Sequence, residues 1–137
     1  MLLRMRIYDT MSNTIRDLKP KDPSKVSIYA CGPTVQDVPH LGHARTALTY
    51  DVLKRYLVWA GFEVFLVSNI TDIDDKIINR ALHEGISEEE LAQKYANIHI
   101  EQLRNFAIKD PDERPKATQF MQDMISILED LMANGSA

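Results

Sequence analysis

The residues from Cys31 to His43 hold most of the side chains in this chain that could do chemistry. They include the chain's single cysteine, a Gly-Pro pair and the sequence His40-Leu-Gly-His43. An apolar run at 26–30 precedes them and a helical pattern follows. The first N–H groups of a helix have no acceptor within the helix, so a strand, a loop and a helix start in this order are typical of phosphate-binding sites.

The two histidines could donate hydrogen bonds to phosphate or ribose oxygens from the start of that helix. Gly42, which lies between them, has no Cβ to keep a ligand away from the backbone. Two other interpretations stay open at this point, namely surface histidines beside a helix cap and a metal-binding pair. The metal pair fits less well, because zinc-binding helices place their histidines at i and i+4.

Each of the two predicted parallel strands is followed by candidate ligand-binding residues. Cys31 follows the first strand and is a packing residue, a nucleophile or one ligand of a zinc site. The sequence Asn-Ile-Thr-Asp-Ile-Asp-Asp-Lys at 69–76 follows the second. Its aspartates are expected to cap the next helix rather than bind a divalent cation. Asn69 and Thr71 are the better candidates for contact with a ligand.

The elements that must position these residues form an α/β pattern. Strands are predicted at 26–30 and 62–67, in parallel and joined by a helix at 42–60 that ends before Gly61, as in a right-handed βαβ unit. Runs at 5–8 and 14–18 predict a hairpin. Further helices are expected at 73–84, at 88–106 after a Ser87/Glu90 capping box, and at 118–133 after a proline-containing loop at 110–115.

Composition sets broad limits on the kind of protein. The 137 residues are 45% hydrophobic, enough for the core of about one domain, and the net charge of −4 argues against holding nucleic acid by bulk electrostatics. We expect no membrane association, since no apolar run approaches the roughly 20 residues of a membrane span and no signal peptide is evident. Together with a lone cysteine, this predicts a cytoplasmic protein.

Taken together, these segments resemble the amino-terminal part of the cysteinyl-tRNA synthetase family, which is a class I aminoacyl-tRNA synthetase family. The resemblance covers nearly the whole chain. It rests on Ile-Tyr-Asp-Thr near the start, Cys31-Gly-Pro-Thr-Val, the class I signature as His40-Leu-Gly-His43, Asp51-Val-Leu, the sequence 69–76 and Arg114-Pro-Lys-Ala-Thr118. The sequence 69–76 is the most diagnostic of these.

The resemblance implies a mechanism and a set of site residues. Cys31 would be one ligand of a zinc ion that binds the thiolate of the substrate cysteine, which gives selectivity over serine. His40, Gly42 and His43 would bind ATP, supplied as its Mg²⁺ complex. The two histidines would act in catalysis while the cysteine carboxylate attacks the α-phosphate and pyrophosphate leaves. The pocket for cysteine and its adenylate would include Gly32, Thr34, Thr46, Asn69 and Thr71.

The resemblance also implies how the chain is divided. We expect the first half of a Rossmann-like, HUP-type nucleotide-binding domain at 1–84, with its N-terminal β-hairpin, and the start of a helical connective insertion at 85–137. Gln36 and Leu41 replace a tyrosine and an isoleucine that are common in the family. The other three zinc ligands, the second class I signature and the regions that bind tRNA(Cys) have no counterpart. We therefore expect a fragment that is inactive alone.

Two alternatives to a synthetase fragment stay open. The first is a fragment of the related ligase of mycothiol synthesis, which joins cysteine to a glucosaminyl-inositol and shares the Cys-Gly-x-Thr and His-Leu-Gly-His elements. Asp75-Lys76 and Arg114-Pro favour the synthetase over this ligase. The second is a non-catalytic nucleotide-binding or interaction module that docks on a partner, which would have no need of Cys31 together with both histidines.

Overall fold

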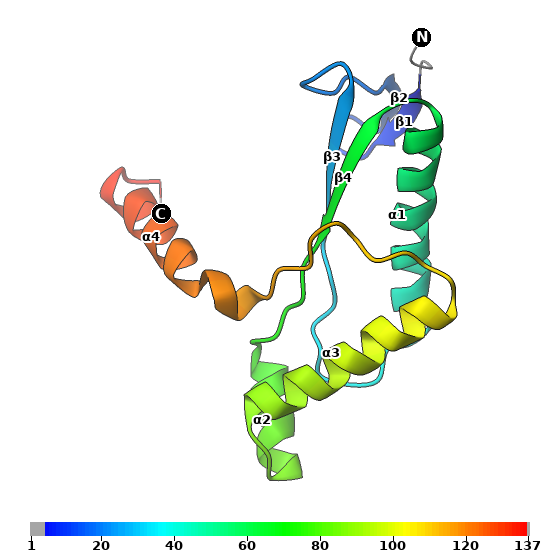
Figure 1. Ribbon diagram of the computed structural model, residues 1–137. Helices are drawn as coiled ribbons and strands as arrows, with labels where there is room; N and C mark the ends of the chain where they lie inside the picture. The colour runs from blue at the N-terminus through cyan, green and yellow to red at the C-terminus, as the bar shows by residue number, and fades with distance from the viewer. Residues whose placement is uncertain (1–4, 137) are drawn as a thin grey trace.

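The computed structural model describes residues 5–136 and has a mixed α/β architecture (Figure 1). A hairpin of β1 (Arg6–Asp9) and β2 (Thr14–Asp17) precedes the parallel pair β3 (Lys25–Ala30) and β4 (Glu63–Ser68). The helices are α1 (Leu41–Trp59), α2 (Asp75–Glu84), α3 (Glu88–Asn105) and α4 (Met121–Ala133), and a 3₁₀ turn, η1 (Ala117–Phe120), precedes α4. The predicted α/β class, hairpin and parallel pair are confirmed.

The central unit is β3–α1–β4, and α1 lies beside the two strands (Figure 1). The strands pair in parallel from Lys25 opposite Glu63 to Ala30 opposite Ser68. The helix ends where Gly61 takes a φ of 96°. Its N–H donates to Val58 O, while the N–H of Phe62 donates to Leu57 O, which is the Schellman arrangement that ends a helix and lets β4 begin at once.

The segment after α3 is more ordered than the loop expected at 110–115. It runs parallel to the end of β4, with bridges that join Val67 to Glu113 and Ile70 to Lys116. The N–H of Ser68 donates to Glu113 O at 3.0 Å, and the N–H of Ile70 donates to Pro115 O at 2.8 Å. Proline can occupy this edge because it needs no backbone donor there. A third extended segment therefore lies beside β4.

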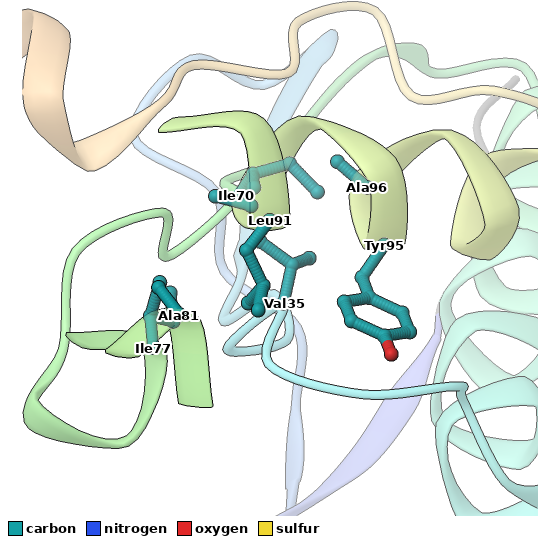
Figure 2. Close-up of a cluster of buried hydrophobic side chains, with 8 residues drawn as sticks. Val35, Ile70, Ile77, Ala81, Leu91, Tyr95 and Ala96 are labelled. Atoms are coloured by element: carbon teal, nitrogen blue, oxygen red, sulfur yellow. The ribbon is translucent and has the colours of Figure 1, made fainter. Parts of the chain in front are cut away.

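The core divides into two clusters. The first lies between α1 and the sheet and contains Val26, Leu57, Ala60 and Phe62. The second fastens α2 and α3 to the loops after the two strands (Figure 2), and its members are Val35, Ile70, Ile77, Ala81, Leu91, Ala92, Tyr95 and Ala96. Because Val35 and Ile70 belong to these two loops, burial of the helices also fixes the segments that carry the candidate site residues.

Local capping explains where α2 and α3 begin. The side chain of Asp74 accepts the Lys76 N–H at the start of α2, and the hydroxyl of Ser87 accepts the Glu90 N–H at the start of α3. The α2 helix starts two residues later than the predicted Ile73, because Asp74 is its cap. The domain division at residue 84 stays a prediction. No helix within residues 5–136 is long and apolar enough to cross a membrane.

Candidate active site

The start of α1 is capped by the two histidines of the signature. The N–H of Gly42 donates to His40 Nδ1, and the backbone N–H of His40 donates to His43 Nδ1, both at 3.1 Å. The imidazole rings lie face to face at a tilt, with their centroids 4.0 Å apart. Both rings therefore satisfy backbone donors that a helix start would otherwise leave without an acceptor.

This capping selects one form of each histidine. A nitrogen that accepts an N–H carries no proton of its own, so in each neutral ring the proton is on Nε2. Partial burial, helped by the nearby His40, lowers the pKa of His43, which favours the neutral ring. Two Nε2–H donors thus stand at the positive end of a 19-residue helix, which is an arrangement suited to phosphate oxygens.

Two glycines of the candidate site are required for steric reasons. A Cβ on Gly42 would lie 2.8 Å from His40 Cε1 and 2.9 Å from His40 Nδ1, so the capping ring itself requires a glycine there. A Cβ on Gly32 would lie 1.6 Å from the backbone oxygen of Asn69. The structure thus gives Gly42 a role in seating the ring of His40 in addition to the ligand access predicted for it.

A cavity of about 390 Å³ opens between the ends of the parallel strands, α1, α3 and the segment after α3. Its wall contains five of the predicted site residues, which are Cys31, Gly32, Thr34, His43 and Thr46. Further lining comes from Ala30, Pro33, Gln36, Ala47, Tyr50, Asp51, Leu66, Ser68, Lys76, His99, Leu103, Ile108, Lys109, Pro111 and Arg114. The fold thus gathers residues up to 84 positions apart, from Ala30 to Arg114, around one space.

The other predicted residues lie beside this cavity and do not form its wall. His40 faces a second, smaller hollow together with Phe106. The side chain of Asn69 accepts the Gly32 N–H at 2.8 Å and donates to the Thr71 hydroxyl at 3.2 Å. Thr71 continues the parallel ladder opposite Thr34. Asn69 and Thr71 thus brace the Cys31 loop, and their contact with a ligand stays a prediction.

Cys31 has an exposed side chain at the rim of this cavity. Exposure removes the interpretation of Cys31 as a buried packing residue. A thiol at this position offers one soft donor to a metal such as zinc. Within residues 5–136, however, no three Cys, His, Asp or Glu side chains lie close enough to hold a metal ion. Cys31 can therefore supply one ligand of a zinc site, but the other described residues do not supply the remaining ligands beside it.

Of the three aspartates after β4, Asp74 caps the following helix as the sequence predicted, while Asp72 binds the η1 turn. Asp74 caps α2, and the carboxylate of Asp72 accepts the N–H of Thr118 at 3.0 Å and its hydroxyl at 2.6 Å. Asp72 therefore fastens the η1 turn to the loop after β4. These contacts give two of the three carboxylates a structural role.

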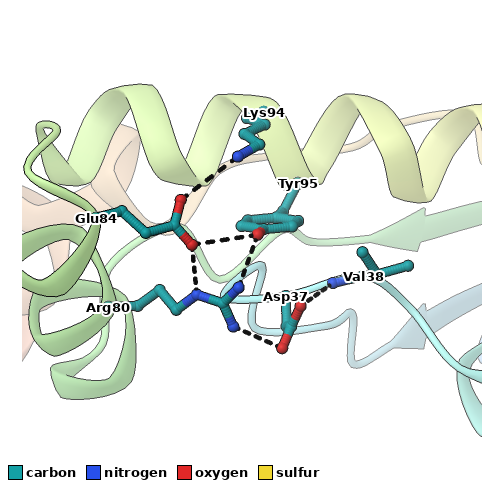
Figure 3. A network of polar contacts seen from close by, with 6 residues as sticks. All are labelled: Asp37, Val38, Arg80, Glu84, Lys94 and Tyr95. Carbon is teal, nitrogen blue, oxygen red and sulfur yellow. Dashed lines mark hydrogen bonds and ion pairs between the residues drawn. The ribbon is translucent and has the colours of Figure 1, made fainter.

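A polar network fixes the loop between β3 and α1 to the helices α2 and α3 (Figure 3). The guanidinium of Arg80 donates to Asp37 at 2.7 Å, to Glu84 at 2.6 Å and to the Tyr95 hydroxyl at 3.0 Å. The hydrogen bond from Arg80 holds the pKa of Glu84 below its ordinary value, and the Val38 N–H, followed by Arg80, does the same for the pKa of Asp37. Asp37 lies three residues before His40, so the network restrains the loop that leads into the His40–His43 signature.

His99 is a candidate site residue that sequence reasoning missed. It lies on α3 at the cavity wall, with its ring edge-on to His43 and the ring centroids 6.1 Å apart. Burial, together with the charge of Arg114, lowers the pKa of His99 to about 4. The available sequence signal was a histidine among the apolar positions of α3, which by itself is typical of a core residue.

A family model and the curated relatives both match this chain to tRNA synthetases. A family model described as the class I (C) tRNA synthetase catalytic domain matches residues 17–137. Among curated relatives, a cysteine–tRNA ligase of Thermodesulfovibrio yellowstonii is 45% identical over 97% of this chain and 27% of its own length. Those of Thermococcus gammatolerans and Streptococcus pneumoniae are 44% and 41% identical, over 98% and 97% of this chain.

The chain spans 28% of the Thermococcus relative and 30% of the Streptococcus relative. Within that span, the matched region contains every residue of the cavity wall and the helix start with its histidine caps. The chain belongs to the family of class I (C) tRNA synthetase catalytic domains.

Proposed function

We propose that this chain forms the first-signature half of a cysteine–tRNA ligase active site. The proposal rests on one observation: His43, at the capped start of α1, and Cys31 line the same cavity. The Nε2–H groups of His40 and His43 would donate to the phosphates of ATP. The carboxylate of cysteine would then attack the α-phosphate, which forms cysteinyl-adenylate and releases pyrophosphate. The cysteinyl group would next pass to tRNA(Cys).

In this proposal Cys31 is one ligand of a zinc ion, and donors outside the described residues complete the site. Zinc bound there would prefer the thiolate of cysteine to the hydroxyl of serine. Gly32, Thr34 and Thr46 would border the amino acid and its adenylate. The cytoplasm as the place of action is part of the same proposal.

Because the relatives are more than three times as long, we propose that the 137 residues bind ligands but do not complete the reaction alone. The test is thermal denaturation of the protein with ATP and with a non-hydrolysable cysteinyl-adenylate analogue. We expect both to raise the melting temperature and His43→Ala to abolish the rise. Cysteine-dependent pyrophosphate exchange should be absent. Exchange by this chain alone would contradict the fragment proposal, and no thermal shift would favour a non-catalytic interaction module that binds no nucleotide.

A further assay separates the synthetase from the mycothiol ligase. In a full-length enzyme that contains this segment, activated cysteine should pass to tRNA(Cys) and not to glucosaminyl-inositol. In the same enzyme Cys31→Ser should lose bound zinc, measured by elemental analysis, together with activity. Retained zinc and activity would contradict the role given to Cys31.

A further inference from the structure

The cavity has a buried histidine to which the proposed chemistry gives no role. His99 is 4% exposed, and its Nδ1 is buried with no hydrogen-bond partner within residues 5–136. A buried polar atom without a partner costs free energy, and native structures rarely leave one unless it serves a purpose. The ring lies at the cavity wall, so a ligand in the cavity reaches Nδ1 once the ring turns about χ2 and brings that buried atom to the cavity.

The same wall carries an excess of positive charge. Arg114 donates to Asp110 at 2.8 Å, and Asp110 also pairs with Arg104 at 2.8 Å, so one carboxylate serves two guanidinium groups. Lys76 and Lys109 also line the cavity and form no ion pair within the described part of the chain. This balance favours an anionic ligand.

The carboxylate on the cavity wall does not offset this charge. This carboxylate belongs to Asp51, which lines the cavity and is 3% exposed. The guanidinium of Arg55 pairs with Asp51 at 2.6 Å and so neutralises it. The charges of Lys76 and Lys109 therefore remain available to a ligand, together with the part of the Arg114 charge that the shared Asp110 leaves unbalanced.

We propose that His99 on α3 and Arg114 in the segment after α3 form a phosphate subsite on the cavity wall, next to His43. The subsite takes one phosphoryl group of a polyphosphate whose neighbouring phosphoryl group is held by His43. His99 donates one hydrogen bond from Nδ1 and Arg114 supplies the charge. The inference rests on the proposed use of ATP and adds a binding group from α3 to it.

Two further observations support this assignment. Nδ1 of His99 is held by no hydrogen bond within the described residues, so the tautomer with a proton on Nδ1 is available. Its low pKa keeps the ring neutral beside Arg114, so the ring can donate without adding a second positive charge. A polyphosphate matches the three cationic side chains of the wall better than the single charge of an amino-acid carboxylate does.

The test is calorimetric titration of the protein with inorganic tripolyphosphate and, separately, with cysteine. We expect His99→Phe to weaken tripolyphosphate binding about tenfold, which corresponds to one hydrogen bond to a charged group. His99→Asn should retain most of the affinity, because its amide N–H lies near the position of Nδ1. His83→Phe is the matched control, since His83 is exposed on α2 and away from the cavity wall. Thermal denaturation checks that each variant folds.

A spectroscopic measurement makes the assignment specific. The ¹⁵N resonance of His99 Nδ1 should shift towards a protonated nitrogen when tripolyphosphate is added to the unmodified protein. Equal affinity of His99→Phe and the unmodified protein, with no shift, would overturn the subsite and would mean that water satisfies Nδ1. An effect on cysteine binding in place of tripolyphosphate would also overturn it.

The same titrations separate this inference from the proposed function. If His43→Ala loses tripolyphosphate while His99→Phe keeps it, the subsite is wrong and the nucleotide site stands. If the unmodified protein binds neither tripolyphosphate nor ATP, both proposals fail.

Discussion

The backbone N–H of His40 donates to Nδ1 of His43 at 3.1 Å, so the second histidine of the signature caps the residue that carries the first. His40 in turn caps the helix through Gly42. The signature therefore has two physical roles at once. Its Nδ1 atoms stabilise the helix start, while its Nε2–H groups remain available to a ligand.

This division of roles predicts that stability and binding can be separated at His40. His40→Ala should lower the free energy of unfolding by about 1 kcal/mol, because the helix loses its N-cap. His40→Asn should restore that stability, since asparagine is a good N-cap, yet bind ATP as weakly as His40→Ala does. Urea denaturation and calorimetric ATP titration measure the two effects. Recovery of ATP affinity by His40→Asn would mean that capping alone explains this histidine.

The packing of Gly32 against Asn69 gives a second prediction. Gly32→Ala should destabilise the protein by about 3 kcal/mol, because its Cβ would overlap the backbone oxygen of Asn69 and that backbone cannot easily move. Gly85→Ala is the control. A Cβ at Gly85 meets nothing within 4 Å, so only its left-handed φ of 68° is penalised, by about 1 kcal/mol. Equal losses in the two variants, measured by urea denaturation, would contradict the steric argument.

The network around Arg80 gives a third prediction (Figure 3). Arg80→Gln should lower the melting temperature and increase hydrogen exchange in the loop from Asp37 to His40, because the guanidinium joins that loop to Glu84 and Tyr95. The contacts lie partly in solvent, so the loss should be smaller in 1 M salt, where the Debye length is about 3 Å.

The variant Arg104→Gln is a useful comparison for Arg80→Gln. Arg104 also pairs with a carboxylate, Asp110, but it lies outside the loop before the signature. Exchange in the loop from Asp37 to His40 should be unaffected in Arg104→Gln. If both variants loosened the loop equally, the network would not be a specific restraint on it.

The sequence predicted those features of the fold that depend on residues close together along the chain. The turn at Gly61, the Ser87 cap and the histidines at the start of α1 each depend on residues within about six positions, so local patterns reveal them. The parallel pairing of β3 and β4 also followed from the length of the intervening helix. These elements supply most of the fold and the rim of the cavity.

Apart from the pairing of β3 with β4, contacts between distant residues were not predicted. Asp72 binds Thr118, which lies 46 positions further along the chain. The edge of β4 pairs with a segment whose prolines had predicted a loop. His99 reaches the cavity only because α3 packs over the ends of the strands. Such contacts depend on how the elements pack, and no local pattern in one sequence encodes them. The missed part of the site is therefore the wall that α3 and the following segment supply.

The buried state of His99 predicts how stability changes with pH. Its pKa is about 4 in the folded protein, against 6.5 in the unfolded chain, so the unfolded state binds the extra proton between these values. The stabilisation is complete above pH 6.5 and is lost as the pH falls towards 4. The total loss from this group is on the order of 3 kcal/mol. His43, whose pKa is also lowered, contributes in the same direction.

Urea denaturation at several pH values measures this loss, and His99→Phe identifies its source. The variant cannot take up the proton, so its stability should change much less between pH 6.5 and pH 4.5. The carboxylates of Asp110 and Asp112 have lowered pKa values and lose their stabilisation mainly below this window, in the variant and the unmodified protein alike. Parallel stability curves for the two proteins across this window would show that His99 is solvated, and would remove the basis for a buried donor in the cavity.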